Sequence, residues 1–171
     1  MAAEYHSIDL AQLGLSSGEG RRLVEEVDVG GFGLAGQRYE PAGRVPVRLD
    51  VSRAVSGHAF RLAFETEVEG PCMRCLADAR VPVAVEAREV HHGGSDEELT
   101  SPYVEGDVLD LGSWAHDALA LALPAQLLCR PDCAGLCAIC GASLNDADPA
   151  EHEHLNERGG PFAKLGELPR E

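Results

Sequence analysis

The sequence has few basic residues for its length. Fourteen Lys and Arg residues stand against 29 Asp and Glu residues, so the 171-residue chain carries a net charge of −15. A surface this acidic repels nucleic acid as a whole, and contact with RNA would require a local basic patch. Basic proteins are better matched as partners, although a high net charge also serves simply to keep a protein soluble.

The sequence also lacks a long apolar segment. The longest apolar run, Ala118–Cys129, is interrupted by Pro124 and falls short of the ~20 residues that a membrane-spanning helix needs. The opening stretch "MAAEYHSIDLAQ" has no basic segment followed by an apolar one, so we do not expect a secretory signal. We therefore expect a cytoplasmic protein without a membrane partner.

Motifs of common catalytic sites are absent as well. There is no G-x-S-x-G, no phosphate-binding loop and no H-E-x-x-H. The glycines of residues 30–43 do not lie between a parallel strand and a helix, and we interpret this segment as a glycine-rich loop. We expect a protein that is not an enzyme and has no small-molecule substrate.

Alternating apolar and polar residues predict an antiparallel sheet. Apolar residues occupy odd positions from Val45 to Val55 and even positions from Phe60 to Val68. The alternation resumes between Val81 and Ala87, where Pro82 favours an edge strand. A period of two with one polar face is typical of a sheet that is covered on one side. Residues 21–29 are compatible with a strand or with a short helix.

One helix is predicted, with Asp110 as its cap and Pro124 after its end. Its apolar stripe consists of Leu111, Trp114, Ala115, Ala118, Leu119 and Ala122. The predicted fold is α+β, mainly antiparallel β-sheet with one principal α-helix and a cysteine-rich, zinc-binding C-terminal segment. We expect residues 1–128 to form the sheet and helix core, and residues 129–171 the Cys/His metal-binding segment and a docking tail, all in one domain.

All six cysteines fall in two groups, and each has a close neighbour. The pairs are Cys72/Cys75, Cys129/Cys133 and Cys137/Cys140, and an H-x-H pair, His152/His154, follows them. Thiolates and imidazoles two to four residues apart are typical zinc ligands, and each tetrahedral site takes four. The polar segment after Cys129 cannot form a core alone, and a bound metal would order it.

The eight candidate ligands would fill two structural Zn²⁺ sites, with four ligands in each. We prefer Cys72, Cys75, Cys129 and Cys133 in one site, and Cys137, Cys140, His152 and His154 in the other. Two C-x2-C pairs sharing one ion, or a single site with leftover thiols, are alternatives. So are disulfides, a redox pair at Cys72 and Cys75, and a solvated loop at His152 and His154. The remaining histidines show no ligand spacing and are expected at the surface or on the helix: His6, His58, His91, His92 and His116.

Five arginines could form a local basic strip along the sheet: Arg53, Arg61, Arg74, Arg80 and Arg88. Such a strip would reach RNA phosphates. The alternative, which we favour, is that these arginines balance the neighbouring carboxylates Glu65, Glu67 and Glu86, because exposed strands routinely carry paired charges.

Four stretches together resemble the bacterial and plastid YceD family: "PCMRCL", "DLGSWAHDALALALP", "LCRPDCAGLCAICGASLN" and "PFAKLGEL". Members often carry a C-x-C after the asparagine of "LN", where this chain has His152 and His154. The resemblance implies a factor for accumulation of large-subunit ribosomal RNA, acting on a large-subunit precursor or a basic ribosomal protein. The alternatives are a zinc-ribbon-like RNA-binding module and a thiol oxidoreductase.

Overall fold

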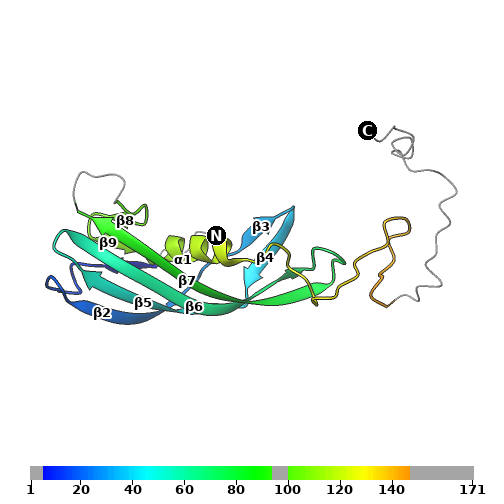
Figure 1. The fold of residues 1–171 in the computed structure, drawn as a ribbon, viewed down its shortest axis with the longest axis horizontal. Helices are drawn as coiled ribbons and strands as arrows, with labels where there is room; N and C mark the ends of the chain where they lie inside the picture. The colour runs from blue at the N-terminus through cyan, green and yellow to red at the C-terminus, as the bar shows by residue number, and fades with distance from the viewer. Residues whose placement is uncertain (1–5, 94–99, 147–171) are drawn as a thin grey trace, which may run out of the picture.

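The computed structural model describes residues 6–93 and 100–146 and contains two antiparallel sheets and one helix (Figure 1). The predicted docking tail, His152 and His154 lie outside these residues. The larger sheet has six strands: β2 (Gly20–Val27), β3 (Phe32–Leu34), β4 (Gln37–Pro41), β5 (Val45–Arg53), β6 (Gly57–Pro71) and β7 (Asp78–His92). The smaller sheet has three: β1 (Ser7–Asp9), β8 (Val104–Glu105) and β9 (Val108–Asp110). Helix α1 spans Leu111–Ala122.

The larger sheet confirms the predicted one-sided alternation. Arg48 and Glu65 point to solvent, whereas the alternating apolar residues of β5 and β6 are buried: Val45, Val47, Leu49, Val51, Phe60, Leu62, Phe64 and Val68. Val55 is the exception, because it lies in the turn after β5 and its side chain is 91% exposed. Burial of one face leaves the other polar, as expected for a sheet covered on a single side.

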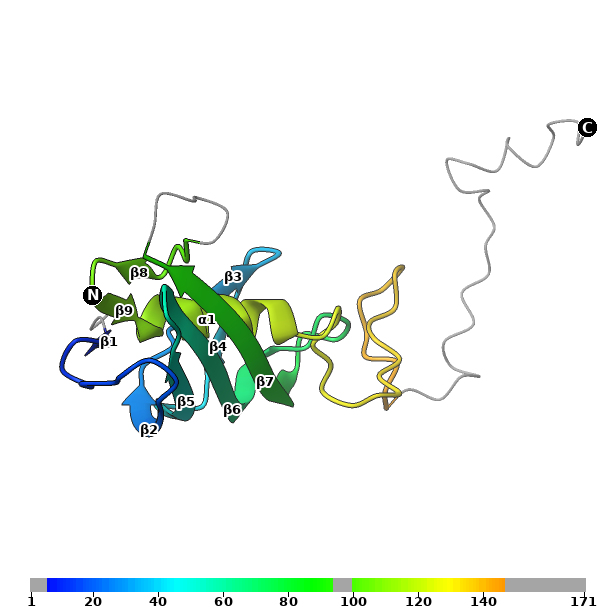
Figure 2. The ribbon, with the colours of Figure 1, turned by 60° about the vertical axis from the view of Figure 1, so that its left-hand side comes forward.

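Helix α1 covers the apolar face of this sheet (Figure 2). Its first turn is capped as predicted, because the Asp110 carboxylate accepts hydrogen bonds from the Ser113 N–H (2.9 Å) and hydroxyl (2.7 Å). The buried side chains of the helix include Trp114, whose ring meets that of Phe60 edge to face at 6.3 Å. The helix ends at Ala122, two residues before Pro124. In the described residues, no helix is long and apolar enough to span a membrane.

Two sequence-based interpretations need correction, and one open alternative is decided. Residues 30–43 are not simply a loop, since β3 and β4 form a hairpin in which Tyr39 is only 1% exposed. Residues 21–29 contain strand β2, paired with β5, and no helix. His58 is buried rather than at the surface, because it lies opposite His91 on β7 and its ring stacks on Phe60.

The longest pair of strands positions the first two cysteines. β6 and β7 pair along their whole length, from Gly57 opposite His92 to Pro71 opposite Asp78. β5 accompanies β6 only as far as Ala63, so the end of the hairpin extends past β5 (Figure 1). β7 pairs with β6 on one side, which agrees with the edge position predicted from Pro82. The Cys72–Cys75 turn therefore lies at the far tip of the sheet.

Candidate metal centre

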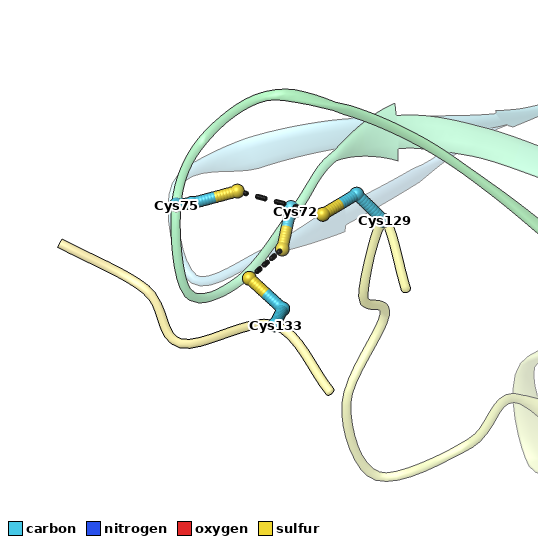
Figure 3. A group of neighbouring side chains, drawn as sticks. All are labelled: Cys72, Cys75, Cys129 and Cys133. Atoms are coloured by element: carbon cyan, nitrogen blue, oxygen red, sulfur yellow. Dashed lines mark hydrogen bonds between the residues drawn. The ribbon is translucent and has the colours of Figure 1, made fainter. Parts of the chain in front are cut away.

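The turn between β6 and β7 is closed by backbone hydrogen bonds around the first cysteine pair. The N–H of Leu76 donates to the carbonyl of Cys72 (2.9 Å), and the N–H of Cys72 donates to the carbonyl of Ala77 (2.7 Å). Leu76 has a φ of 62°, in the left-handed region that non-glycine residues rarely adopt. This turn brings the thiols of Cys72 and Cys75 to the chain that follows α1 (Figure 3).

The second cysteine pair is held against this turn by contacts of its own. Leu127 is 1% exposed, and its carbonyl accepts a hydrogen bond from the Met73 N–H at 2.8 Å. The Arg74 guanidinium donates to the carbonyl of Cys133 at 2.9 Å. Backbone and side-chain bonds thus align Cys129 and Cys133 with the tip of the sheet.

Four sulfur atoms converge at this place (Figure 3). The Sγ atoms of Cys72 and Cys133 are 3.7 Å apart, those of Cys75 and Cys129 are 3.6 Å apart, and all four lie within 4.8 Å of one another. These distances exceed the ~2.05 Å of a disulfide. A tetrahedral zinc site with Zn–S bonds of about 2.3 Å has sulfur–sulfur edges of about 3.8 Å. The arrangement therefore fits the donor set of a Zn²⁺ ion.

The electrostatics of the group favour a cation. Burial is the largest influence on Cys72 and opposes ionisation, but N–H groups of Arg74, Cys129 and Cys75 together outweigh it and lower the pKa of its thiol to about 6. Burial and hydrogen bonds to the neighbouring thiols raise the pKa of Cys129 to about 12. Four thiolates this close repel one another, and a divalent cation between them removes that repulsion.

Asn145 supports the cluster and was missed by the sequence analysis. Its side-chain N–H donates to the Cys133 sulfur at 3.5 Å, and its carbonyl oxygen accepts from the Ala134 N–H at 2.8 Å. The Arg130 guanidinium also donates to that oxygen at 3.0 Å. Such bonds orient a metal ligand and tune its charge. The only signal in the sequence was an amide side chain shortly after the last cysteine.

Tyr39 is a second support that the sequence analysis missed. Its hydroxyl donates to the carbonyl of Pro71 at 2.9 Å, directly before Cys72. Its ring lies on Gly70, where a Cβ atom would stand 2.7 Å from the Tyr39 Cε1 atom. The absence of a side chain at Gly70 thus lets Tyr39 brace the strand that carries Cys72.

The cluster that the structure describes contains four of the eight predicted ligands. Cys137 and Cys140 occupy the tip of the next hairpin, and among the described residues they are not part of a group of three or more metal-binding side chains. His152 and His154 lie beyond residue 146, outside the described part of the chain. A site made of these four residues therefore stays a prediction.

The arginines considered as a basic strip are largely occupied by other contacts. Arg61 and Arg88 both pair with Glu86, at 2.9 Å and 3.4 Å, and Arg80 pairs with Glu69 at 3.3 Å. Arg74 donates to the Cys133 carbonyl, as described above. These contacts agree with the interpretation that the arginines balance neighbouring carboxylates. Glu86 is a partner as expected, and Glu69 is a partner where Glu65 and Glu67 were expected.

Comparisons with known proteins place the chain in a family. The family model described as "Large ribosomal RNA subunit accumulation protein YceD" matches residues 60–169. Uncharacterized proteins of Mycobacterium bovis and Mycobacterium tuberculosis are each 30% identical over 169 residues, covering 95% of this chain and 80% of the relative. One of Mycobacterium leprae is 32% identical over 105 residues, covering 57% of this chain and 46% of that protein. No solved structure matches. The chain belongs to the YceD family.

Proposed function

We propose that this protein is a non-enzymatic factor that supports accumulation of large-subunit ribosomal RNA, with a Zn²⁺ ion bound by Cys72, Cys75, Cys129 and Cys133. The family assignment supports the ribosomal role. The observation that carries the rest is the convergence of four thiols within 4.8 Å. Their spacing and burial suit a bound metal better than any of the alternatives considered from sequence.

The role of the metal in this proposal is structural. Four protein thiolates complete a tetrahedral zinc site and leave no position for water or substrate. The ion would join the tip of the β6–β7 hairpin to a segment more than fifty residues later, since 54 positions separate Cys75 from Cys129. Cross-links that close long loops reduce the entropy of the unfolded chain most. Zinc would thus hold residues 127–146 in place rather than activate a reactant.

A redox role for Cys72 and Cys75 is less well supported. The cysteines of a thioredoxin-like pair stand where a strand leads into a helix N-terminus. Here the pair joins two strands, β6 and β7, and each thiol faces a third or fourth cysteine. This setting is typical of a metal ligand.

The proposed partner is a basic component of the large-subunit precursor. The net charge of −15 favours a basic ribosomal protein over bare RNA as the first contact. Three of the arginines that could reach RNA phosphates have other partners: Arg61 pairs with Glu86, Arg80 with Glu69, and Arg74 donates to the Cys133 carbonyl. We place this contact in the cytoplasm, where the precursor is assembled.

The test is depletion of the protein in its host, followed by measurement of large-subunit rRNA against small-subunit rRNA and by sedimentation of the tagged protein. We expect large-subunit rRNA to fall and the tagged protein to sediment with large-subunit precursors. Rescue with the full chain should restore the rRNA ratio. Rescue with Cys72→Ser/Cys75→Ser should fail, and this variant should bind less zinc.

Ala125→Ser is the matched control, because it places a serine at an exposed position near the cluster and leaves all thiols intact. It should restore the rRNA ratio as the unchanged chain does. Unchanged rRNA levels and subunit profiles after depletion would refute the ribosomal role. Full zinc content in Cys72→Ser/Cys75→Ser would refute the metal site independently of that role.

A further inference from the structure

The first cysteine turn (residues 72–77) and the second cysteine turn (residues 137–142) have the same backbone conformation. In each, the N–H of the residue after the second cysteine donates to the carbonyl of the first cysteine, at 2.9 Å and 2.8 Å. That residue is left-handed in both turns, with a φ of 62° at Leu76 and 75° at Gly141. Glycine adopts this conformation without steric cost, whereas leucine does not. The conformation of the backbone therefore does not explain why the first turn has a leucine.

Burial does not explain this leucine either. The side chain of Leu76 is 59% exposed, so it contributes little to an apolar core. A residue that strains the backbone and leaves its apolar side chain in water is better explained by a contact with another molecule, because grouped apolar side chains at a surface mark sites of interaction.

Leu76 belongs to a group of exposed apolar side chains, which we call the tip patch. The other members are Met73 of the first cysteine turn, Ile139 of the second, and Leu136 directly before the second. Among the described residues nine large apolar side chains are exposed, and these four are the ones that lie in or next to a cysteine turn. The other five are spread over β2, β7, β9, α1 and the turn after β5.

The two turns lie next to each other at one end of the molecule, beyond the end of β5 (Figures 1 and 2). The Arg74 guanidinium donates to the carbonyl of Cys133 at 2.9 Å. A Cβ atom added to Gly135 would stand 3.3 Å from the Arg74 carbonyl oxygen, so the two segments are in close contact there. Leu136 and Ser143 form an antiparallel bridge at the base of the second turn. These contacts hold both halves of the tip patch in one region.

The charges around the tip patch favour a basic partner. The three arginines at this end of the molecule already have partners: Arg74, Arg80 and Arg130. The carboxylates of Asp78 and Asp146 are exposed and make no ion pair with any residue that the structure describes. Apolar side chains flanked by free carboxylates complement a surface that has apolar side chains among lysines and arginines.

We propose that the tip patch is the docking surface for the basic ribosomal protein that is the partner of this chain. Apolar side chains of that protein would pack on the patch, and its lysines or arginines would pair with Asp78 and Asp146. The inference rests on the proposed function and deepens it, because it names the surface that makes the contact. The proposed metal would then keep the first cysteine turn and residues 127–146 in the shape that the partner binds.

Photo-crosslinking of the full, zinc-loaded chain tests where the partner docks. Benzoylphenylalanine replaces Leu76 or Ile139, and the probes are the total protein extracted from purified large subunits of the host and, separately, the purified large-subunit rRNA. We expect both positions to crosslink to one basic ribosomal protein, which mass spectrometry identifies. Val55 is the matched control position, because it is 91% exposed and lies in the turn after β5, away from the cysteines. Crosslinks from Val55 to the same protein, or crosslinks from the patch to rRNA, to a second copy or to its own chain instead, would overturn the proposal.

Leu76→Gly/Ile139→Ser removes two apolar side chains of the patch and leaves every thiol in place. Relief of the left-handed strain at position 76 offsets the greater freedom of glycine in the unfolded chain, so we expect the melting temperature and zinc content to stay unchanged. Binding to the crosslinked ribosomal protein should weaken by about tenfold or more. Val55→Ser should bind as the unchanged chain does. Equal binding by Leu76→Gly/Ile139→Ser would overturn the docking surface.

Depletion of the protein separates failure of this proposal from failure of the proposed function. If depletion lowers large-subunit rRNA and Leu76→Gly/Ile139→Ser restores it fully, the docking surface is wrong and the ribosomal role stands. If depletion leaves large-subunit rRNA unchanged, the ribosomal role is wrong and the docking surface falls with it.

Discussion

At the scale of single residues, the two cysteine turns share one backbone conformation although different residues follow the second cysteine of each. Leu76 keeps a left-handed φ of 62° although its side chain is 59% exposed and gains little from burial. That conformation costs a non-glycine residue roughly 1–2 kcal/mol. Gly141 takes the equivalent place in the second turn without that cost. The shared conformation therefore follows from the placement of the thiols rather than from the preference of the residue.

Gly70 is a position where one methyl group should matter. A Cβ atom added at this residue would overlap the ring of Tyr39 and approach the Arg38 carbonyl oxygen to 3.0 Å. We expect Gly70→Ala to lower the free energy of unfolding by about 1–3 kcal/mol, because Tyr39 is buried and cannot move aside freely. Thermal and urea unfolding measure this change.

Gly33→Ala is the comparison for Gly70→Ala. Gly33 lies in β3 with nothing within 4 Å of an added Cβ atom. We expect Gly33→Ala to change the free energy of unfolding by less than about 0.5 kcal/mol. Equal stability of the two variants would show that Tyr39 does not brace the strand before Cys72.

At the scale of elements, the β6–β7 hairpin and α1 have linked roles. The hairpin carries Cys72 and Cys75 to its tip, and the helix directs the following chain to the same tip. Leu127 is the apolar anchor of that chain, since it joins the main core two residues before Cys129. The position of the cysteine group therefore depends on where the helix starts and ends.

The cap of α1 can be tested directly. Asp110→Ala removes the acceptor of two hydrogen bonds from Ser113 and should destabilise the protein by about 1 kcal/mol. Asp110→Asn keeps an acceptor at the cap and should retain most of the stability. Urea unfolding of both variants provides the measurement, and equal losses in the two would argue that the charge of Asp110, not its capping bond, stabilises the helix.

At the scale of the whole molecule, the described chain has two regions that are held together differently. The sheet and α1 share one large apolar core that runs from Leu10 to Leu127. The buried apolar cluster at the cysteine site is small and contains Cys72, Ala79 and Cys133. Apolar burial therefore stabilises the first region, and the second depends on thiols, backbone bonds and the proposed metal.

Removal of metal should affect these regions unequally. With free Zn²⁺ about a thousand times above its Kd, binding would contribute about 4 kcal/mol to stability. After chelation we expect faster amide hydrogen exchange at Cys133, Cys137 and Leu144, while Leu49 and Leu62 in the sheet stay protected. Exchange followed by mass spectrometry, with and without chelator, measures the difference.

The Cys129→Ser variant should reproduce the effect of chelation in that experiment, because it removes one ligand of the first site. Exchange rates that are the same with and without chelator would contradict a structural metal. Uniform acceleration across the sheet as well would show that the two regions unfold as one unit.

Much of this arrangement was determined by the sequence itself. The alternation of apolar and polar residues in β5, β6 and β7 can be predicted from the sequence alone, because each strand buries every second side chain. The cap of α1 at Asp110 and the end of the helix before Pro124 can likewise be predicted from the neighbouring residues in the sequence. The cysteine spacings likewise indicated which thiols would lie near one another, and the structure brings Cys72, Cys75, Cys129 and Cys133 together.

The tertiary structure alone decided the rest. β3 and β4 are only three and five residues long, and the burial of Tyr39 depends on Gly70, 31 positions away in the sequence. His58 is buried because the register of β6 and β7 sets it beside His91. The meeting of Cys72 and Cys75 with Cys129 and Cys133 requires the hairpin and helix to be packed first, because no local preference of the chain brings together residues so far apart.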